Sequence, residues 1–242
     1  MKLVVVIFLA IYDSNVGIIN IFKEYDHNLN YYVDNRYSSY GVYGHEEIKI
    51  RAKKVYEFLK EEKRIIVSDL DAAGILYKNK NIFYGEDSLK RILKDKNILM
   101  LTSKNLKENN FIANIVDANF QTLDVTYLIN ASLCFAGDLV VEEILRQYLE
   151  GINLSSYDLI FFAASPLHLY RDLFKKVLNK YRILTNIDPI LMDYTYIKEN
   201  ILRDYFYLTG SKRDFYLLAE NYLRAKKRLK KEEILNISTW SM

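Results

Sequence analysis

Residues 158–174 have the sequence DLIFFAASPLHLYRDLF, in which an apolar run leads through a short polar turn into a helical pattern. Asp158–Ala163 is mostly large and apolar, as in strands that helices cover on both faces. Ser165-Pro166 then marks a helix start, because proline is tolerated in the first turn of a helix. The stretch therefore predicts a buried strand, a short loop and a helix over Leu167–Lys180.

The same alternation of apolar runs and amphipathic segments extends along the chain. Further strands are predicted at Leu3–Leu9, Leu29–Val33, Arg64–Ser68, Ile98–Leu101, Thr122–Ile129 and Tyr181–Thr185. Further helices are predicted at His45–Glu62, at Leu139–Leu149 with Asp138 as its N-cap, and at Asp214–Lys231. Strands that alternate with helices predict an α/β protein with mainly parallel sheets.

The composition argues against several classes of protein. The 242 residues are enough for one large domain or two small ones. Half of them are apolar, so a sizeable core can be buried. The formal net charge is +3, which gives no reason to expect a nucleic acid or a membrane as partner. Lys2 and the apolar run Leu3–Ile11 resemble a short signal peptide, but no small-residue cleavage site follows and Asp13 comes at once. We therefore expect a buried first strand in a cytoplasmic protein.

The cysteine and the histidines do not indicate a metal site. Cys134 is the single cysteine, which rules out an internal disulfide and any CxxC site, and we expect it to be a small buried residue. His27, His45 and His168 have no other ligand residue at metal-binding spacing, so we expect no metal. The basic cluster Arg224–Lys231 is more typical of a solvated helix end than of a site for an acidic partner.

Ligands of parallel α/β proteins bind at the carboxyl ends of the strands. The segments that follow the predicted strands are short and polar, and each precedes a predicted helix. They are Asp13–Gly17, Asp34–Arg36, Ser68–Ala73, Thr102–Asn105 and Ala163–Pro166. Their hydroxyls and backbone N–H groups would suit an anionic ligand.

These loops, in this order, resemble those of the glutamate racemases of the aspartate/glutamate racemase superfamily. The segments that carry the resemblance are Asp13–Ile18 (D-S-G-V-G-G in the family), Ser39-Tyr40-Gly41 (P-Y-G), Ser68–Ala73 (A-C-N-T-A-S), Thr102–Lys107 (T-x-x-T-I-K), Asp158–Phe174 (D-x-L-I-L-G-C-T-H-Y-P-L-L-K-D-L-F) and the tail Phe206–Leu223, which is similar to the last helix. Together they span nearly the whole chain, and their order is more specific than any one segment.

The resemblance implies two similar α/β halves with mainly parallel sheets that face each other across a cleft. We expect the first half to comprise residues 1–93 and 206–242, and the second to comprise residues 94–205. Such enzymes need no cofactor: one cysteine on each side of the substrate's α-carbon exchanges a proton with it. The resemblance also implies a role in supplying D-glutamate for peptidoglycan, and it allows a homodimer.

Both positions of the catalytic cysteines differ in this chain. Asp69 stands at the first position and Ala164 at the second. Because alanine carries no exchangeable proton, the resemblance implies that racemisation by two thiols is absent. The positions most similar to the family's ligand contacts are Asp13, Ser14, Tyr40, Gly41, Asp71, Asn105 and Ser165.

Several of these residues have more than one interpretation. Asp69 and Asp71 are typical helix-cap or loop residues, although Asp69 would also serve as a lone base. Asp13-Ser14 would suit an N-cap as well as a ligand contact. Three aspartates at one site would repel a dicarboxylate, so a neutral or cationic ligand is favoured over glutamate. His168 is expected to be a partly buried surface residue, or to replace the missing acid.

Three functions therefore remain. The first is a pseudoenzyme that binds a small, amino-acid-like molecule or acts as a regulator. The second is an active isomerase with rewired acid–base groups, in which Asp69 works with His168 or Ser165. The third is a structural or partner-binding protein whose cleft is filled by side chains. A Ser-His-Asp hydrolase is not supported, because the sequence has no G-x-S-x-G elbow.

Overall fold

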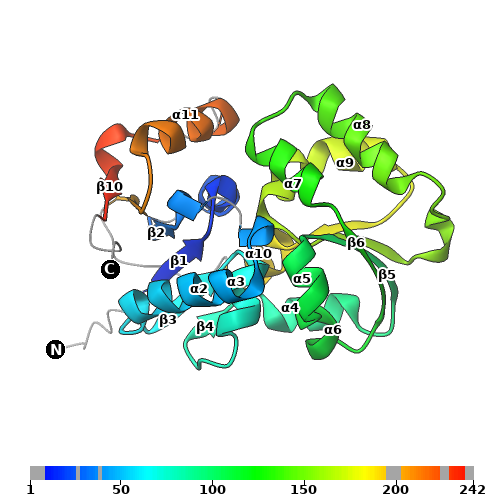
Figure 1. The fold of residues 1–242 in the computed structure, drawn as a ribbon, viewed down its shortest axis with the longest axis horizontal. Helices are drawn as coiled ribbons and strands as arrows, with labels where there is room; N and C mark the ends of the chain where they lie inside the picture. The colour runs from blue at the N-terminus through cyan, green and yellow to red at the C-terminus, as the bar shows by residue number, and fades with distance from the viewer. Residues whose placement is uncertain (1–8, 26–27, 38–39, 195–202, 224–228, 238–242) are drawn as a thin grey trace.

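The computed structural model describes residues 9–25, 28–37, 40–194, 203–223 and 229–237. Its strands form two sheets (Figure 1). The first contains β1 (Leu9–Asp13), β2 (Asn30–Val33), β3 (Arg64–Val67), β4 (Ile82–Phe83), β9 (Tyr205–Leu208) and β10 (Ile234–Asn236), in the order β10-β9-β2-β1-β3-β4. The second contains β5 (Asn97–Thr102), β6 (Asn119–Asp124), β7 (Leu159–Phe162) and β8 (Ile183–Thr185), in the order β6-β5-β7-β8.

Every strand pair within the described residues is parallel, which confirms the predicted α/β class with parallel sheets. The strands of the first sheet come from residues 9–83 and 205–236, and those of the second from residues 97–185. The predicted division into halves at residues 93 and 206 is compatible with this membership, and it stays a prediction.

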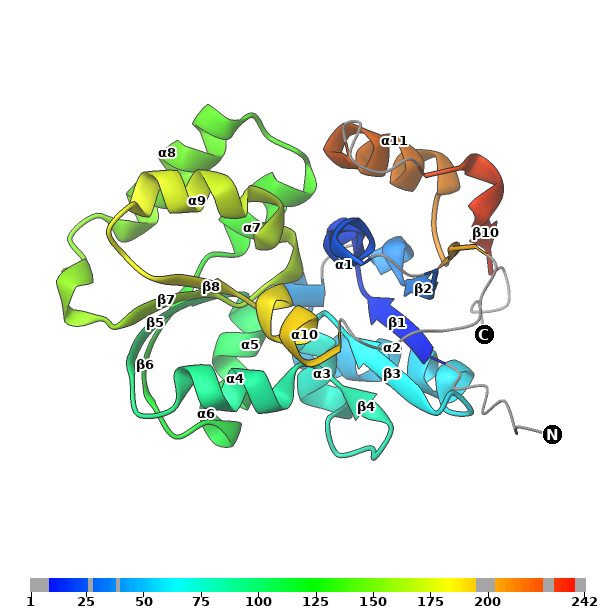
Figure 2. The same ribbon diagram turned by 180° about the vertical axis from the view of Figure 1, so that it is seen from behind.

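Helices cover both faces of each sheet (Figures 1 and 2). Beside the first sheet lie α1 (Ile19–Glu24) and α11 (Lys212–Leu223) on one face, and α2 (His45–Leu59) and α3 (Leu70–Leu76) on the other. Beside the second lie α7 (Thr126–Leu133), α8 (Asp138–Leu149) and α9 (Arg171–Leu178) on one face, and α4 (Glu86–Leu93), α5 (Lys104–Asn109) and α6 (Phe111–Ile115) on the other. Helix α10 (Ile187–Tyr194) follows β8, and short 3₁₀ helices occupy Val16–Ile18, Asn35–Tyr37, Tyr40–Val42, Leu154–Ser156, Ser165–Tyr170 and Lys231–Glu233.

Two hydrophobic cores lie on opposite sides of the sheets, and each core takes side chains from both sheets. Successive side chains of a strand point to opposite faces, so Ile11 enters one core and Tyr12 the other. The first core also contains Phe162 of the second sheet, and the second core contains Phe161. The shared packing therefore fixes the position of one sheet relative to the other.

The predicted strand Thr122–Ile129 is wrong in position. The strand β6 begins at Asn119 and ends at Asp124, and helix α7 follows at once. The Asp124 carboxylate accepts hydrogen bonds from the backbone N–H and the hydroxyl of Thr126, at 2.9 and 2.7 Å. This local turn of an aspartate with its second neighbour starts the helix inside an apolar run, which periodicity alone does not reveal.

Several predicted helix boundaries are also wrong. Asp138 is the first residue of α8 and Gly137 is the N-cap. The predicted helix Leu167–Lys180 is a 3₁₀ turn up to Tyr170, followed by α9. In the tail, residues 205–208 form β9, and α11 begins at Lys212 and is described up to Leu223. The remainder of the predicted helix includes residues 224–228, which lie outside the described residues.

Two further predictions concern single segments. The predicted strand Leu3–Leu9 lies outside the described residues except for Leu9, and β1 continues from there to Asp13. Cys134 is exposed, so its predicted burial is wrong. Within the described residues, no helix is both long and apolar enough to cross a membrane.

The first core depends on a cluster of aromatic rings around Phe206, which is fully buried. Its ring stacks on Tyr31 with the centroids 4.6 Å apart and contacts Phe22 at 5.1 Å. We expect Phe206→Ala to lower the free energy of unfolding by about 3–5 kcal/mol, because it leaves a cavity in the core. Urea denaturation measures this change, with Leu217→Ala as the control, since Leu217 is 49% exposed. Equal losses in the two variants would contradict the central position of this ring.

Candidate functional site

The carboxyl ends of strands from both sheets meet around one small cavity. From the first sheet it is lined by Asn15, Gly41, Asp69 and Asp71, and from the second by Ser103, Ala164 and Ser165. The structure thus brings together five of the nine predicted site residues, which are Gly41, Asp69, Asp71, Ala164 and Ser165. The other four do not line the cavity: Asp13, Ser14, Tyr40 and Asn105. The cavity volume is about 10 Å³, which is the room that a single water molecule needs.

Asp69 is buried, and both oxygens of its carboxylate accept hydrogen bonds. One oxygen accepts hydrogen bonds from the backbone N–H groups of Asp71 and Ala72, at 2.8 and 3.1 Å, which makes Asp69 the N-cap of α3. The other oxygen accepts a hydrogen bond from the hydroxyl of Ser14. The interpretation of Asp69 as a helix cap is confirmed. Burial raises the pKa of this carboxyl, and its hydrogen bonds oppose the rise.

Asp71 connects the two sheets. Its carboxylate accepts hydrogen bonds from the hydroxyl of Ser103 at 2.8 Å and from Nδ2 of Asn105 at 2.7 Å. The Asn105 Oδ1 in turn lies 3.2 Å from Nδ1 of His45, at the start of α2. Burial, and secondly the charge of Asp69, raises the pKa of Asp71 to about 7. A side chain predicted as a cap or loop residue is therefore a cross-sheet contact.

Asp13 is fully buried and does not line the cavity. Its oxygens accept hydrogen bonds from the hydroxyl of Ser68 at 2.6 Å and from the backbone N–H of Asn15 at 3.0 Å. Burial and the nearby charge of Asp69 raise the pKa of Asp13 well above its usual range. Asn15 caps the first 3₁₀ turn by accepting from the N–H of Gly17 at 2.6 Å, so the interpretation of Asp13-Ser14 as the N-cap is wrong.

Two further amides join the sheets beside the cavity. The side chain of Asn20 donates to the carbonyl oxygen of Ser165 at 3.0 Å, and that of Asn186 donates to the carbonyl oxygen of Ser68 at 2.6 Å. Sequence analysis did not single out these residues. Asn186 directly follows the carboxyl end of β8, which is the signal that would have found it, whereas Asn20 lies within α1 and carries no such signal.

Gly41 and Tyr40 have different roles at this site. A Cβ atom at Gly41 would lie 2.4 Å from Cβ of Ser103, so only glycine allows the two sheets to approach here. The Tyr40 hydroxyl is directed away from the cavity, because it donates to Asp34 at 2.7 Å. Arg51 binds the same carboxylate through two nitrogens, at 2.7 and 3.2 Å. Tyr40 is thus anchored by a buried ion pair.

His168 does not line the cavity, and it is buried, so its prediction as a partly buried surface residue is wrong. Its Nδ1 contacts the hydroxyl of Thr185, which donates to Asp188 at 2.9 Å. Arg171 forms an ion pair with Asp188 at 2.9 Å. Burial lowers the pKa of the imidazole to about 4 against the opposing charge of Asp188, so the ring is neutral at pH 7.

The ionisable side chains among the described residues that line the cavity are aspartates, since none of these residues is lysine, arginine or histidine. No group of three or more His, Cys, Asp or Glu side chains in the described part of the chain could hold a metal ion. His27 lies outside the described residues.

Comparison with known proteins gives matches in structure only. No protein-family model and no curated protein matches the sequence. The glutamate racemase of Francisella tularensis in complex with D-glutamate superposes with a TM-score of 0.75 at 12% identity, covering 95% of this chain and 97% of that chain. The fold is that of the glutamate racemases. The enzyme of Thermus thermophilus in complex with β-chloro-D-alanine has a TM-score of 0.74 at 14% identity, and that of Bacillus anthracis has 0.71 at 18%, each covering 95% of this chain and 96% of that chain.

The glutamate-racemase fold confirms the resemblance that the sequence segments indicated. Structural similarity at these identities establishes the shared architecture of two parallel sheets. What this chain does with the architecture depends on the residues around its own cavity.

The raised pKa of Asp71 predicts how stability depends on pH. The Asp71 carboxyl has a pKa of about 7 in the folded protein, against an ordinary value of 3.8. The protonated form of this carboxyl therefore stabilises the folded state. This contribution is present below about pH 4 and is lost as the pH rises through 7. Asp71→Asn removes this dependence of stability on pH. As the pH rises from 4 to 7, the variant should therefore gain stability relative to wild type, by about 1.4 kcal/mol or less per pH unit.

Denaturant unfolding from pH 4 to 8 measures this difference. Asp117→Asn serves as the matched control, because Asp117 is exposed and lies outside the site. Parallel stability profiles of wild type and Asp71→Asn would contradict the assigned environment of Asp71.

Proposed function

We propose that this protein is a non-racemising relative of the glutamate racemases that binds a small, neutral or cationic, amino-acid-like molecule between its two sheets. One observation carries the proposal: Asp69 and Ala164, which the sequence resemblance aligns with the family's two cysteines, border the same cavity. Neither residue supports the chemistry of paired thiols. The methyl group of Ala164 has no exchangeable proton, and the Asp69 carboxylate already accepts three hydrogen bonds.

The charge of the cavity supports the class of ligand. Two buried aspartates, Asp69 and Asp71, line it, with no lysine or arginine among the described lining residues. A dicarboxylate would add like charges at short range in a poorly solvated site, which costs several kcal/mol. An ammonium group would instead be attracted. The complexes of two neighbours with D-glutamate and with β-chloro-D-alanine support an amino-acid-like ligand in general.

Binding in this cavity requires the carboxyl ends of the sheets to separate, because about 10 Å³ does not admit an amino acid. The groups that would be released are those of Asp71, Ser103 and Asn105. They are carboxylate, hydroxyl and amide groups, which are able to exchange a cross-sheet hydrogen bond for one to a ligand.

The small cavity also favours a second candidate function, that of a structural or partner-binding protein without a ligand. In that case the contacts between the sheets are permanent, and the site is a filled remnant of a cleft. The binding measurements below separate the two candidates.

A rewired isomerase with His168 as the second acid has less support. The imidazole contacts Thr185 and lies outside the lining of the cavity. Ser165 does line the cavity, but its hydroxyl takes part in proton transfer only when a neighbouring base accepts its proton. The neighbouring carboxyl of Asp13 has a strongly raised pKa and is therefore a poor candidate for this base. The family role in supplying D-glutamate for peptidoglycan is therefore not part of our proposal.

Proton exchange at the α-carbon tests the loss of racemisation. Protein in heavy water with L- and D-glutamate, aspartate and a panel of neutral amino acids should give no exchange above a protein-free blank in proton NMR. The assay detects one-sided proton abstraction as well as complete racemisation. Exchange that disappears in Asp69→Asn would sink the proposal and establish a rewired enzyme.

Calorimetric titration tests the ligand class. We expect lysine, ornithine or a neutral amino acid to bind at least tenfold more tightly than glutamate, and Asp71→Asn to weaken cationic ligands selectively by removing a charge. The matched control is Asp117→Asn, which changes the same charge on the surface. If no member of this panel binds, the structural candidate replaces the binding one.

A further inference from the structure

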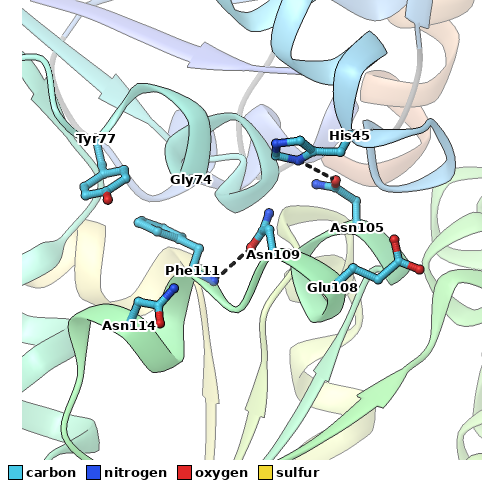
Figure 3. A pocket seen from close by; sticks show the side chains of 8 residues that line it. All are labelled: His45, Gly74, Tyr77, Asn105, Glu108, Asn109, Phe111 and Asn114. Atoms are coloured by element: carbon cyan, nitrogen blue, oxygen red, sulfur yellow. Dashed lines mark hydrogen bonds between the residues drawn. The ribbon is translucent and has the colours of Figure 1, made fainter.

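A second, larger cavity lies between α3 of the first sheet and α5 and α6 of the second, and it is open in this structure. Its volume is about 470 Å³, within the range of small-molecule sites. The residues that line it include His45, Tyr77, Asn105, Glu108, Asn109 and Phe111 (Figure 3). We refer to it as the α3–α5 chamber. Its interpretation does not depend on the proposed function of the closed cavity.

One wall of the chamber is aromatic. The rings of Tyr77 and Phe111 contact each other with their centroids 5.1 Å apart and their planes inclined by 47°. Gly74 makes this possible, because a Cβ atom there would lie only 3.1 Å from Cγ of Phe111. Tyr77 is 36% exposed, so part of its ring remains available to a ligand. Aromatic walls of this kind favour flat, aromatic ligands.

Asn109 supplies a hydrogen-bond donor without a partner. Its Oδ1 accepts from the backbone N–H of Phe111 at 2.8 Å, which fixes the orientation of the amide. Its Nδ2 is buried and has no hydrogen-bond partner. In Figure 3 this nitrogen points away from Phe111 and towards α3, into the space between Gly74 and Asn105. A buried N–H group without a partner is unfavourable, so a ligand that brings an acceptor to it gains affinity.

The charge of the chamber selects against anions. Glu108 is the acidic residue among its described lining residues, and no lysine or arginine lines it. The Glu108 carboxylate has only a loose, exposed ion pair with Lys104, at 3.8 Å. Its charge favours a neutral or cationic ligand in the chamber over an anion. His45, by contrast, already contacts Asn105.

We propose that the α3–α5 chamber binds a planar heteroaromatic amine without negative charge. A ring of this class packs on the exposed part of Tyr77, its ring nitrogen accepts from Nδ2 of Asn109, and its amino group faces the side of the chamber on which Glu108 lies. Adenine and cytosine are the simplest biological examples, because each carries an acceptor nitrogen next to an amino group. Asn105 contacts both His45 at the chamber and Asp71 at the closed cavity, so a ligand here lies one side chain away from the cross-sheet contact.

Calorimetric titration of the full chain with adenine and with cytosine tests the proposal. We expect one or both to bind, and Tyr77→Leu and Asn109→Asp each to weaken the affinity about tenfold. Asn109→Asp keeps the acceptor for the N–H of Phe111 and removes only the donor. Adenosine should bind more tightly than its 5′-monophosphate, since no cation of the chamber meets the phosphate.

The matched controls are Tyr127→Leu and Asn130→Asp, which make the same changes on α7, away from the chamber, and both should bind like wild type. Circular dichroism establishes that each variant is folded. The proposal is overturned if neither base binds, if both chamber variants bind as wild type does, or if the monophosphate binds more tightly than the nucleoside. Tyr77→Leu and Asn109→Asp should bind the amino-acid panel of the closed cavity as wild type does, so the two proposals fail independently.

Discussion

The contact of Asp71 with Ser103 and Asn105 holds the carboxyl ends of the two sheets together, and the other features of the site depend on it. The contact is possible because Gly41 has no side chain where it meets Ser103. Once the sheets are this close, the cavity between them has room for about one water molecule. The position of Asp71 at the interface also explains its raised pKa, since closure removes the carboxyl from solvent.

Burying several carboxyls without a cation is unfavourable, and this chain offsets the cost with hydrogen bonds. Each of Asp13, Asp69 and Asp71 accepts from at least two donors, among them serine hydroxyls and backbone N–H groups. The arrangement resembles a site built to be completed by a positive or hydrogen-donating group more than a site built for an anion.

Most of the fold was predictable from the sequence, because apolar runs of four or more residues mark the buried parallel strands. Short strands such as Ile82–Phe83 escaped, since two residues give no period, and the start of α7 was hidden inside an apolar run. Five residues that line the cavity were predictable from their places near the ends of strands, whereas Asn20, which joins the sheets beside it, was not. Their contacts were not: that Asp71 reaches across to Ser103, or that Tyr40 turns towards Asp34, depends on distances between segments far apart in the chain.

The two hydrophobic cores each cross from one sheet to the other, and this sharing bears on how the molecule moves. Halves with separate cores swing apart on a hinge at little cost. Here a wide opening would expose apolar side chains of both sheets to water, at about 25 cal/mol for each Å². Small sliding of packed layers is therefore the favoured motion. For the same reason, neither half is expected to persist alone: the chain should unfold as one cooperative unit.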